Sequence, residues 1–485
     1  MCERLYILEG GVGAGSKVKM VNELLEGTHL VASMEAIMLA VQAGIDPWII
    51  HDILSNCAGS SWVFKNHVPK LLKGDHSKHY SMDTIVRNLR SVLDMAKLLT
   101  FPLPLLAVAH QQLLYGCSRK SGDDYDTTFV KISETILGVN IIDASNKESY
   151  NPEELADVVS ATSNSVKRIG FIGLGAMGFG MATHLVKSKF CVSGYDVYKP
   201  TLSRFENAGG LVGNSPAEVA KDVEVLIIMV TNETQAESVL YGNLGALSAL
   251  PAGATVILSS TVTVGFVSQL ALRLQDEKKD FMLVDAPVSG GAARASTGEL
   301  TIMASGTDEA LKRAGSVLSA LSEKLYIIKG GCGAGSSVKM VNQLLAGIHI
   351  ASAAEAMAFG ARLGLNMRML FEIIMNCEGM SWMFGNRVPH MLESDYTPYS
   401  AIDIWLKDLG IVSQECSSRK IPVPLATVAL QQYISGSAAG WGRLDDSAVV
   451  KYCGFKQAVV YLQIYEMFTG VKVEDKLPVL KKEDV

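Results

Sequence analysis

The stretch RIGFIGLGAMGFGMATHLVKS, residues 168–188, decides the fold of this chain. It joins an apolar strand-like run to a helical pattern through three glycines, Gly173, Gly175 and Gly178. In such a turn the first glycine permits a tight bend, the second lets a pyrophosphate approach the backbone, and the third lets the helix pack on the strand. A second strand-like run, CVSGYD, ends in Asp196. This context predicts a dinucleotide-binding unit rather than a plain glycine turn.

Asp196 also bears on the choice of dinucleotide. A carboxylate after the second strand accepts hydrogen bonds from the adenosine ribose hydroxyls and repels a 2′-phosphate, which favours NAD. Lys199, three residues later, can partly offset that repulsion, so NADP stays open.

Outward from this stretch, the chain changes character. Between 167 and 329, short β-branched runs alternate with helical patterns, which predicts a parallel α/β sheet of the Rossmann type. The runs are RIGFIG, VLIIMV, TVILSS, FMLVDAP and KLYIIK. From 330 to 471, long apolar-periodic segments without strand character predict an all-α domain. The charged remainder, 472–485, is expected to be a frayed tail.

The helical part of the chain occurs twice. GGVGAGSKVKMVNELLEG at 10–27 recurs as GGCGAGSSVKMVNQLLAG at 330–347, and the same offset of 320 residues relates Trp62 to Trp382. A period of this size indicates a duplicated domain rather than a solenoid. Residues 1–116 are therefore predicted to form a second all-α copy that lacks a dinucleotide-binding half. The stretch 117–166 would be a linker with a short helix over TTFVKISETILGV.

Composition narrows the class of protein. The 485 residues are 48% hydrophobic and 19% charged, and the net charge of −6 disfavours non-specific binding of nucleic acid. No uninterrupted apolar stretch reaches the length of a membrane helix, and the start of the sequence has no signal-peptide pattern. The eight cysteines form neither a CxxC pair nor a Cys/His cluster. We therefore expect reduced thiols, no metal and a cytoplasmic location.

Two polar segments follow strand-like runs, at the edge where open α/β sheets bind ligands. One is Ser259-Ser260-Thr261, and the other is the run DAPVSGG, which ends in Ser289, Gly290 and Gly291. A serine followed by two glycine amides makes a small nest of donors that suits a carboxylate. Taken singly, each segment is more typical of a strand-end turn.

A lysine near the start of the second helical domain is the candidate for acid/base chemistry. Lys339 and Asn342 are three residues apart in GAGSSVKMVNQ, so on a helix they face the same side. A lysine partly buried beside a cofactor can have its pKa lowered and can exchange a proton with an alcohol/carbonyl pair. A lone lysine at a helix start is more often a solvated surface residue.

Together, the motifs GLGAMGFGMA, SSTV, DAPVSGG and GxGxxxKxxNQ, in this order and at these spacings, resemble the β-hydroxyacid dehydrogenase family. That family includes 3-hydroxyisobutyrate dehydrogenase, tartronate semialdehyde reductase and, more distantly, 6-phosphogluconate dehydrogenase. The resemblance covers 167 to about 450, and the helical half again at 1–130. It implies a Rossmann domain followed by an all-α 6-phosphogluconate-dehydrogenase-like domain. It also implies NAD(P)-dependent oxidation of a small hydroxy acid, and we expect a homo-oligomer.

The resemblance also implies roles for single residues. Lys339 would be the catalytic acid/base, with Asn342 and Gln343 orienting the substrate. The substrate carboxylate would be bound by Ser289, Gly290 and Gly291. The cofactor would contact the three loop glycines and Asp196 together with Ala176, Met177, Val230, Thr231, Ser260, Thr261 and Lys407, the lysine of a Lys407-Asp408 pair.

Three positions depart from the commoner family pattern: Leu258 replaces Asp, Arg294 replaces Gly, and Glu299 replaces Thr. These variants are similar to the branch that oxidises four-carbon sugar acids, L-threonate or D-erythronate. We therefore favour such a substrate over 3-hydroxyisobutyrate. Arg294 is equally compatible with a cationic fork for a polar substrate and with an exposed structural residue.

Two further pairs of residues attract notice. His349 and its counterpart His29 are expected to be core or interface histidines rather than catalytic groups. Glu355 and its counterpart Glu35 are likewise expected to have packing or hydrogen-bonding roles.

The first helical copy keeps Lys19 and Asn22, but Glu23 stands where the second copy has Gln343, and Arg87-Asn88 where it has Lys407-Asp408. Without a hydride acceptor this copy is expected to be inactive by itself. Two interpretations, which are compatible with each other, stay open: it is the remnant of a longer protein with two complete dehydrogenase units, or an internal pseudo-dimer partner packed on 330–471. Two other classes of function stay open for the chain: a catalytically silent nucleotide-binding module and a structural piece of a larger multi-domain protein.

Overall fold

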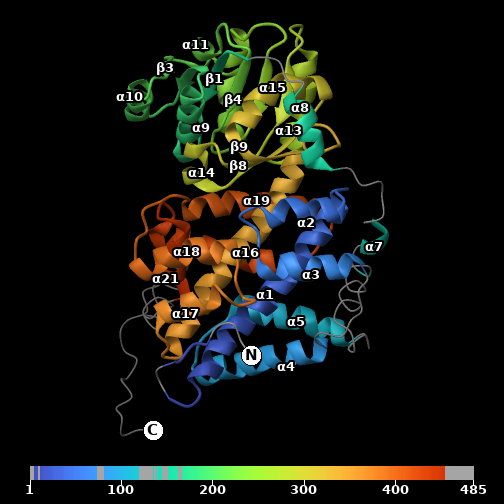
Figure 1. Cartoon of the computed structure of the whole chain (residues 1–485), viewed down its shortest axis with the longest axis vertical. Coiled ribbons are helices and arrows are strands. Elements are labelled where there is room, and N and C mark those ends of the chain that lie inside the picture. The colour runs from blue at the N-terminus through green and yellow to red at the C-terminus, as the bar shows by residue number, and fades with distance from the viewer. Residues whose placement is uncertain are drawn as a thin grey trace, which may run out of the picture.

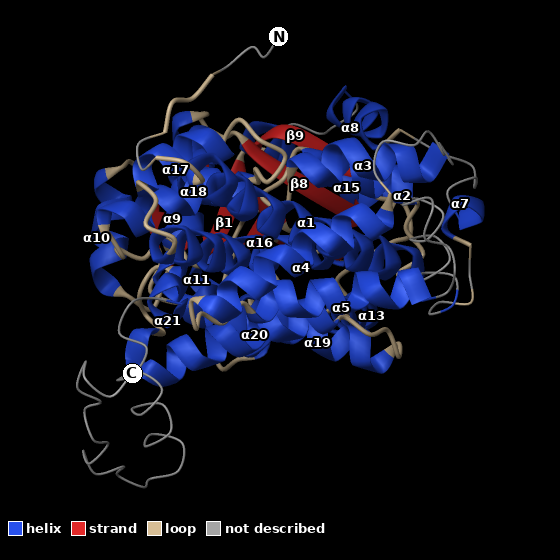
Figure 2. Cartoon of the chain, turned by 90° about the horizontal axis from the view of Figure 1, so that it is seen from below, coloured by secondary structure: helices blue, strands red, loops and turns tan. Residues whose placement is uncertain are grey.

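The computed structural model describes residues 5–8, 11–73, 81–118, 135, 138, 140–144, 151–161 and 166–453. The strands and the helices that cover them lie at one end of the long axis, and helices from both ends of the chain are interleaved at the other (Figure 1). Seen from the helical end, these helices lie in front of the sheet (Figure 2). Most of the predicted linker helix over 127–139, residues 454–471 and the predicted tail 472–485 lie outside the described residues.

One sheet contains the nine strands of the described residues, in the order β3-β2-β1-β4-β5-β6-β8-β7, with β9 beside β8. Strands β1 to β6 run parallel, β8 is antiparallel to β6 and β7, and β9 is parallel to β8. The parallel order 3-2-1-4-5-6 is that of the Rossmann fold. The strands are β1 Arg168–Ile172, β2 Cys191–Tyr195, β3 Leu211–Val212, β4 Val225–Ile228, β5 Thr255–Leu258, β6 Met282–Asp285, β7 Val288–Ser289, β8 Leu300–Gly306 and β9 Ser322–Ile327.

Helices cover both faces of this sheet, which is why its strands are apolar throughout. Ile227 and Ile257 point to one face with α8, α9 and α15, whereas Leu226 and Val256 point to the other with α11, α12 and α13. The helices of this part are α8 Pro152–Ala161, α9 Ala176–Lys187, α10 Lys199–Asn207, α11 Pro216–Ala220, α12 Glu233–Tyr241, η1 Ala246–Ser248, α13 Val264–Asp276, α14 Gly291–Thr297 and α15 Asp308–Leu321.

The two helical copies fold alike. The first consists of α1 Ala14–Gln42, α2 Pro47–Ser55, α3 Trp62–Lys73, α4 Met82–Leu98 and α5 Pro104–Ser118, followed by the short α7 Ile141–Ala144. The second consists of α16 Ala334–Arg362, α17 Met367–Ile374, α18 Trp382–Glu393, α19 Ile402–Ser418 and α20 Pro424–Gly436, then η2 Ser437–Trp441, η3 Asp446–Val449 and α21 Val450–Cys453. The long helices α1 and α16 have bounds that differ by the same 320 residues as the sequence repeat.

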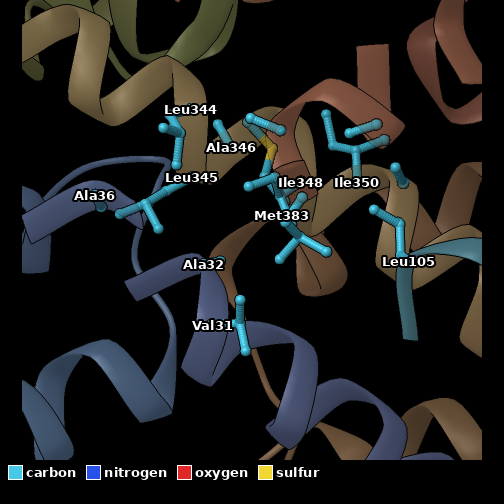
Figure 3. Close-up of a cluster of buried hydrophobic side chains, with 14 of the residues drawn as sticks. Val31, Ala32, Ala36, Leu105, Leu344, Leu345, Ala346, Ile348, Ile350 and Met383 are labelled. Atoms are coloured by element: carbon cyan, nitrogen blue, oxygen red, sulfur yellow. The ribbon is translucent and has the colours of Figure 1, made fainter. Parts of the chain in front are cut away.

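The copies share one core and exchange equivalent contacts. Helices α1 and α16 pack together, and side chains of α1, α5, α16 and α18 meet in one apolar cluster (Figure 3). Trp62 donates its backbone N–H to the Met380 carbonyl, and Trp382 donates its own to the Ser60 carbonyl, both at 2.9 Å. This backbone contact is thus made in both directions.

Two buried carboxylates repeat this exchange. Glu355 of α16 accepts a hydrogen bond from the Leu105 N–H at the start of α5 (3.0 Å), and Glu35 of α1 accepts one from the Leu425 N–H at the start of α20 (2.7 Å). A carboxylate at a helix N-terminus satisfies otherwise unpaired N–H groups. Each central helix therefore caps a helix of the other copy.

Helices α1 and α16 are also long and apolar enough to cross a membrane by length and composition. In the structure, however, 89% and 94% of their apolar windows are buried inside the protein. This burial is typical of the central helices of a protein core.

Several elements were not predicted from the sequence: the short β3, β7 and α7, and the longer strand β8 and helix α8. Strand β8, LTIMASG, was not among the predicted strands, because Met, Ala and Ser carry little strand signal. Helix α8 forms where only polar linker was expected, although Asn151 caps it, Pro152 is its first residue and two glutamates lie in its first turn. Those are ordinary signals of a helix start.

Candidate active site

The glycine-rich loop joins β1 to α9 in the conformation that its sequence predicts. Gly173 has φ 97°, and a Cβ there would collide with the Met229 carbonyl. A Cβ on Gly178 would collide with the Gly173 carbonyl, whereas nothing lies within 4 Å of the Cβ position of Gly175. The free space at Gly175, which precedes the first turn of α9, fits a pyrophosphate held by the helix N-terminus.

Asp196 lies directly after β2 and is tied to this loop. Its carboxylate accepts hydrogen bonds from the Leu174 N–H at 2.7 Å and from the Tyr198 N–H at 2.8 Å. A carboxylate retains further lone pairs beyond these two bonds. The side chain is therefore fixed at the end of β2 and can still accept a bond from a ribose hydroxyl.

A cavity of about 660 Å³ lies between the carboxyl edge of the sheet and the second helical copy. Most residues proposed for the site line it: Gly175, Ala176, Met177, Gly178, Val230, Thr231, Thr261, Ser289, Gly290, Gly291, Lys339, Gln343 and Lys407. Four others do not line it: Gly173, Asp196, Ser260 and Asn342. The buried Ser260 instead accepts a hydrogen bond from the Val230 N–H at 2.8 Å and so supports the cavity wall.

Lys339 is a buried cation in this cavity. Burial lowers the pKa of its amine to about 8, while Asp408 and Cys57 act in the opposite direction and Lys407 lowers the pKa further. A lysine whose pKa lies near neutrality can both give and take a proton at physiological pH.

Asp285, at the end of β6, holds the helix that carries Lys339. Its buried carboxylate accepts hydrogen bonds from the N–H groups of Gly333 (3.0 Å) and Ser336 (2.8 Å) and from the hydroxyls of Ser336 (2.7 Å) and Ser305 (3.1 Å). Asp285 was not predicted as a functional residue, although an acidic residue at a strand end can stabilise the start of a helix that packs beside it.

A chain of polar contacts runs through the site. Asn342 donates its amide to Gln343 Oε1 at 2.9 Å, and Gln343 in turn donates to Asp408. Asp408 pairs with Lys407 at 2.8 Å, and Lys407 donates to the Thr261 carbonyl at 2.9 Å. The helical copy and the sheet are therefore connected across the cavity.

The DAPVSGG segment forms β7 and the start of α14. Gly290 and Gly291 have φ values of 134° and 77°, which only glycine adopts readily. Arg294, in α14, forms an ion pair with Glu323 at 3.4 Å and does not line the cavity. These contacts match the role of an exposed structural residue rather than that of a cationic fork for the substrate.

One wall of the cavity was missed by the sequence analysis. Trp382, Asn386 and His390 lie four residues apart on α18 and line the cavity together. Such spacing places side chains on one helix face and is a signal that was available. Other missed lining residues include Ala58, Met383, Arg387, Tyr399, Ile404 and Trp405.

His29 and His349, and Lys19 of the first copy, do not line this cavity. His29 and His349 are buried against each other, with ring centroids 4.3 Å apart, at the contact between the copies. The Lys19 side chain is 72% exposed. In the part of the chain that the structure describes, no group of three or more His, Cys, Asp or Glu side chains is placed to hold a metal ion.

Family comparisons divide the chain as the fold does. Residues 168–330 match the NAD-binding domain of 6-phosphogluconate dehydrogenase. Residues 13–132 and 333–453 both match a second family, described as the NAD-binding domain of NADP-dependent 3-hydroxyisobutyrate dehydrogenase. The double match supports a duplication of the helical domain.

Individual relatives match about three fifths of this chain and nearly all of their own length. An L-threonate dehydrogenase of Cupriavidus necator is 49% identical over 285 residues, which are 59% of this chain and 95% of the relative. The L-threonate dehydrogenase of Escherichia coli is 42% identical, with 58% and 93% covered. A mitochondrial 3-hydroxyisobutyrate dehydrogenase of Mus musculus is 33% identical, with 61% and 90% covered.

Solved structures show the same extent of similarity. A 3-hydroxyisobutyrate dehydrogenase of Salmonella typhimurium is 40% identical, with a TM-score of 0.56, and the match covers 59% of this chain and 99% of that one. A 3-hydroxyisobutyrate dehydrogenase of Mycobacterium tuberculosis is 27% identical, with a TM-score of 0.53 and the same coverage.

Proposed function

The chain belongs to the β-hydroxyacid dehydrogenase family, whose members oxidise small hydroxy acids with NAD(P), and from that membership we propose that it oxidises a four-carbon sugar acid such as L-threonate or D-erythronate. Relatives named L-threonate dehydrogenase are 39% to 49% identical, against 33% for the mouse 3-hydroxyisobutyrate dehydrogenase. The polar side chains of Gln343, Asn386 and His390 in the cavity suit a substrate with several hydroxyls.

A single observation carries the catalytic part of this proposal. The buried amine of Lys339 lines the same cavity as the glycine-rich loop and the Ser289-Gly290-Gly291 segment. The proposed proton acceptor, cofactor site and carboxylate site thus line one cavity, which is what the oxidation of a hydroxy acid requires.

Each group has a task in the proposed reaction. NAD(P), when bound, supplies the hydride acceptor. Ser289 and the amides of Gly290 and Gly291 hold the substrate carboxylate and fix the hydroxyl-bearing carbon. Neutral Lys339 takes the hydroxyl proton as the C–H bond breaks, and protonated Lys339 returns it in the reverse reaction. Gln343 orients the substrate. Asn342 acts indirectly, by positioning Gln343, because Asn342 is buried and does not line the cavity.

We propose NAD as the preferred cofactor, because Asp196 would repel the 2′-phosphate of NADP. The test is a reduction assay with NAD and NADP against L-threonate, D-erythronate, 3-hydroxyisobutyrate and glycerate. The largest kcat/KM is expected with a four-carbon acid and NAD. A larger value with 3-hydroxyisobutyrate would overturn the substrate assignment, and a larger value with NADP would overturn the cofactor assignment.

We also propose that the first helical copy serves as an internal pseudo-dimer partner, and that the protein is a cytoplasmic homo-oligomer. The reciprocal contacts between the two copies support the first part, because a two-fold dimer exchanges contacts in this way. Light scattering of the purified protein tests the oligomer. A mass equal to the 52.1 kDa of one chain would refute it.

A further inference from the structure

The loop after α2, residues 56–60, brings the first helical copy into contact with the active site. Ala58 donates its backbone N–H to Ser289 Oγ at 3.2 Å, and Gly59 donates its own to Asn342 Oδ1 at 2.9 Å. Both acceptors belong to motifs of the proposed substrate site, whereas both donors come from the copy that has no dinucleotide-binding half.

The same loop is anchored to the sheet. Asn56 donates its side-chain amide to the Tyr326 hydroxyl on β9 at 2.9 Å, and its carbonyl accepts a hydrogen bond from the Thr301 hydroxyl on β8 at 3.2 Å. The loop therefore contacts β7, β8, β9 and α16 at the place where the sheet meets the helices.

Little space separates Gly59 from α16. A Cβ on Gly59 would lie 2.9 Å from the Asn342 carbonyl oxygen and 3.0 Å from both Asn342 Oδ1 and Leu345 Cβ. Any side chain at this position would push against the helix turn that follows Lys339.

The duplication provides a matched loop without an active site. In residues 376–380, Gly379 donates its N–H to Asn22 Oδ1 at 2.9 Å, and its Cβ position lies 2.9 Å from that oxygen and 3.0 Å from Leu25 Cβ. Asn376 likewise donates to the Tyr6 hydroxyl at 3.2 Å. The packing is the same, but the neighbouring Lys19 is exposed and faces no cofactor loop.

We propose that residues 56–60 are a positioning element of the active site, through which the first helical copy completes the substrate site of the chain. The inference rests on the proposed function of Ser289, Asn342 and Lys339. Ser289 Oγ accepts the Ala58 N–H, and the Ser289 hydroxyl also forms a side-chain hydrogen bond with the Cys57 thiol of the same loop, so two residues of the first copy fix its position.

Gly59 acts through Asn342, behind the cavity lining. By donating to Asn342 Oδ1, it turns the Asn342 amide group towards Gln343, which then points its own amide at Asp408. The orientation of Gln343, which lines the cavity, thus depends on a backbone group of the first copy.

The test compares Gly59→Ala with Gly379→Ala in the full chain. The two substitutions meet nearly identical crowding, so both should lower the thermal midpoint by similar amounts. Only Gly59→Ala is expected to lower kcat/KM for the hydroxy acid, by roughly tenfold to a hundredfold, since a displacement of an ångström can cost that much. It should also move the pH profile of oxidation, because the surroundings of Lys339 change.

A milder pair keeps the test decisive if an alanine at position 59 prevents folding. Asn56→Ala removes the side-chain hydrogen bond to the Tyr326 hydroxyl on β9. Asn376→Ala removes the equivalent hydrogen bond to the Tyr6 hydroxyl. A larger loss of kcat/KM in Asn56→Ala supports the proposal. Equal kinetics within each pair would overturn it.

A readout independent of turnover separates this inference from the proposed function. Amide hydrogen exchange of peptides covering 288–293 and 339–344 should become faster in Gly59→Ala and stay unchanged in Gly379→Ala. Faster exchange in Gly59→Ala, together with a wild type that oxidises no hydroxy acid, would sink the function and keep the positioning role. Unchanged exchange in Gly59→Ala would sink the positioning role whatever the wild type oxidises.

Discussion

The amine of Lys339 should set how the reaction depends on pH. Its pKa of about 8 means that oxidation, which needs the neutral amine, becomes faster as the pH rises through 8 and then levels off. Reduction, which needs the protonated amine, should become slower over the same range. Initial rates measured in both directions between pH 6 and 10 check this, and parallel profiles in the two directions would contradict it.

Removal of that amine should abolish most turnover. Lys339→Ala is expected to lower kcat by roughly 10² to 10⁴, the range for loss of a general acid/base. The matched control is Lys19→Ala, since Lys19 holds the same place in the first copy and is exposed. An equal effect of the two substitutions would argue against a catalytic role for Lys339.

The site residues that belong to short sequence motifs could be predicted, whereas those that depend on tertiary contacts could not. The loop glycines, Ser289 and Lys339 are recognisable because glycine-rich turns and helix positions carry chemistry within a short segment. Ala58 has no such signal: it is a small residue in a turn, and only packing against a segment 231 positions away brings it to Ser289. Asn342 was given a direct role, and its burial suggests an indirect one.

At the scale of elements, the start of α16 depends on Asp285. An asparagine there would place an N–H₂ group among four donors, so Asp285→Asn should lower the free energy of unfolding by about 1–3 kcal/mol and reduce kcat as α16 shifts. Urea unfolding and initial rates measure the two effects. The exposed Asp276→Asn, which should change stability by less than about 0.5 kcal/mol, is the control. Unchanged stability of Asp285→Asn would show that this carboxylate is dispensable.

Helices and strands were predictable where the apolar residues recur with a single period along the sequence. The first parallel strands are apolar and β-branched because helices cover both faces of the sheet. The helical segments are recognisable because their apolar residues recur at helical spacing. Strand β8 was missed because its residues have little strand propensity and neighbouring strands hold it in place. Helix α8 was missed although its capping signals are local.

At the scale of the whole molecule, four buried groups at the contact between the copies respond to pH in opposite ways. Burial raises the pKa of Glu35 and Glu355 to about 7 and lowers that of His29 to about 3, and it also lowers the pKa of His349. The carboxyls stabilise the fold at low pH, and this contribution is lost as the pH rises from about 4.5 to 7. The histidines stabilise it above about 6.5, and their contribution is lost as the pH falls.

Single substitutions should therefore tilt the stability curve in opposite directions between pH 4.5 and 6.5. Relative to the wild type, Glu355→Gln should make the free energy of unfolding rise with pH, by at most about 1.4 kcal/mol per pH unit for one proton. His29→Gln should make it fall with pH to a similar extent. Urea unfolding at several pH values measures both slopes, and slopes of the same sign would contradict the assignment.

Loss of the first copy should uncover the apolar side of α16. A chain without residues 1–150 keeps the sheet and the second helical copy, but the surface that α1 covers would face water. We expect this variant to aggregate or to form dimers through α16, which sedimentation and light scattering distinguish from a soluble monomer. Full solubility with unchanged assembly would refute the role of the first copy as a covering partner.

The tether between the two copies has a consequence for how the protein tolerates dilution and mutation. Two subunits that meet by diffusion separate when they become scarce, whereas two halves of one chain remain at a fixed, high effective concentration. The contact between α1 and α16 should persist at any protein concentration. The two copies are also separate segments of the sequence, so a substitution in one copy does not occur in the other, as it would in a homodimer. That freedom is consistent with the replacement of Lys407 by Arg87 and of Gln343 by Glu23 in the half that faces no cofactor.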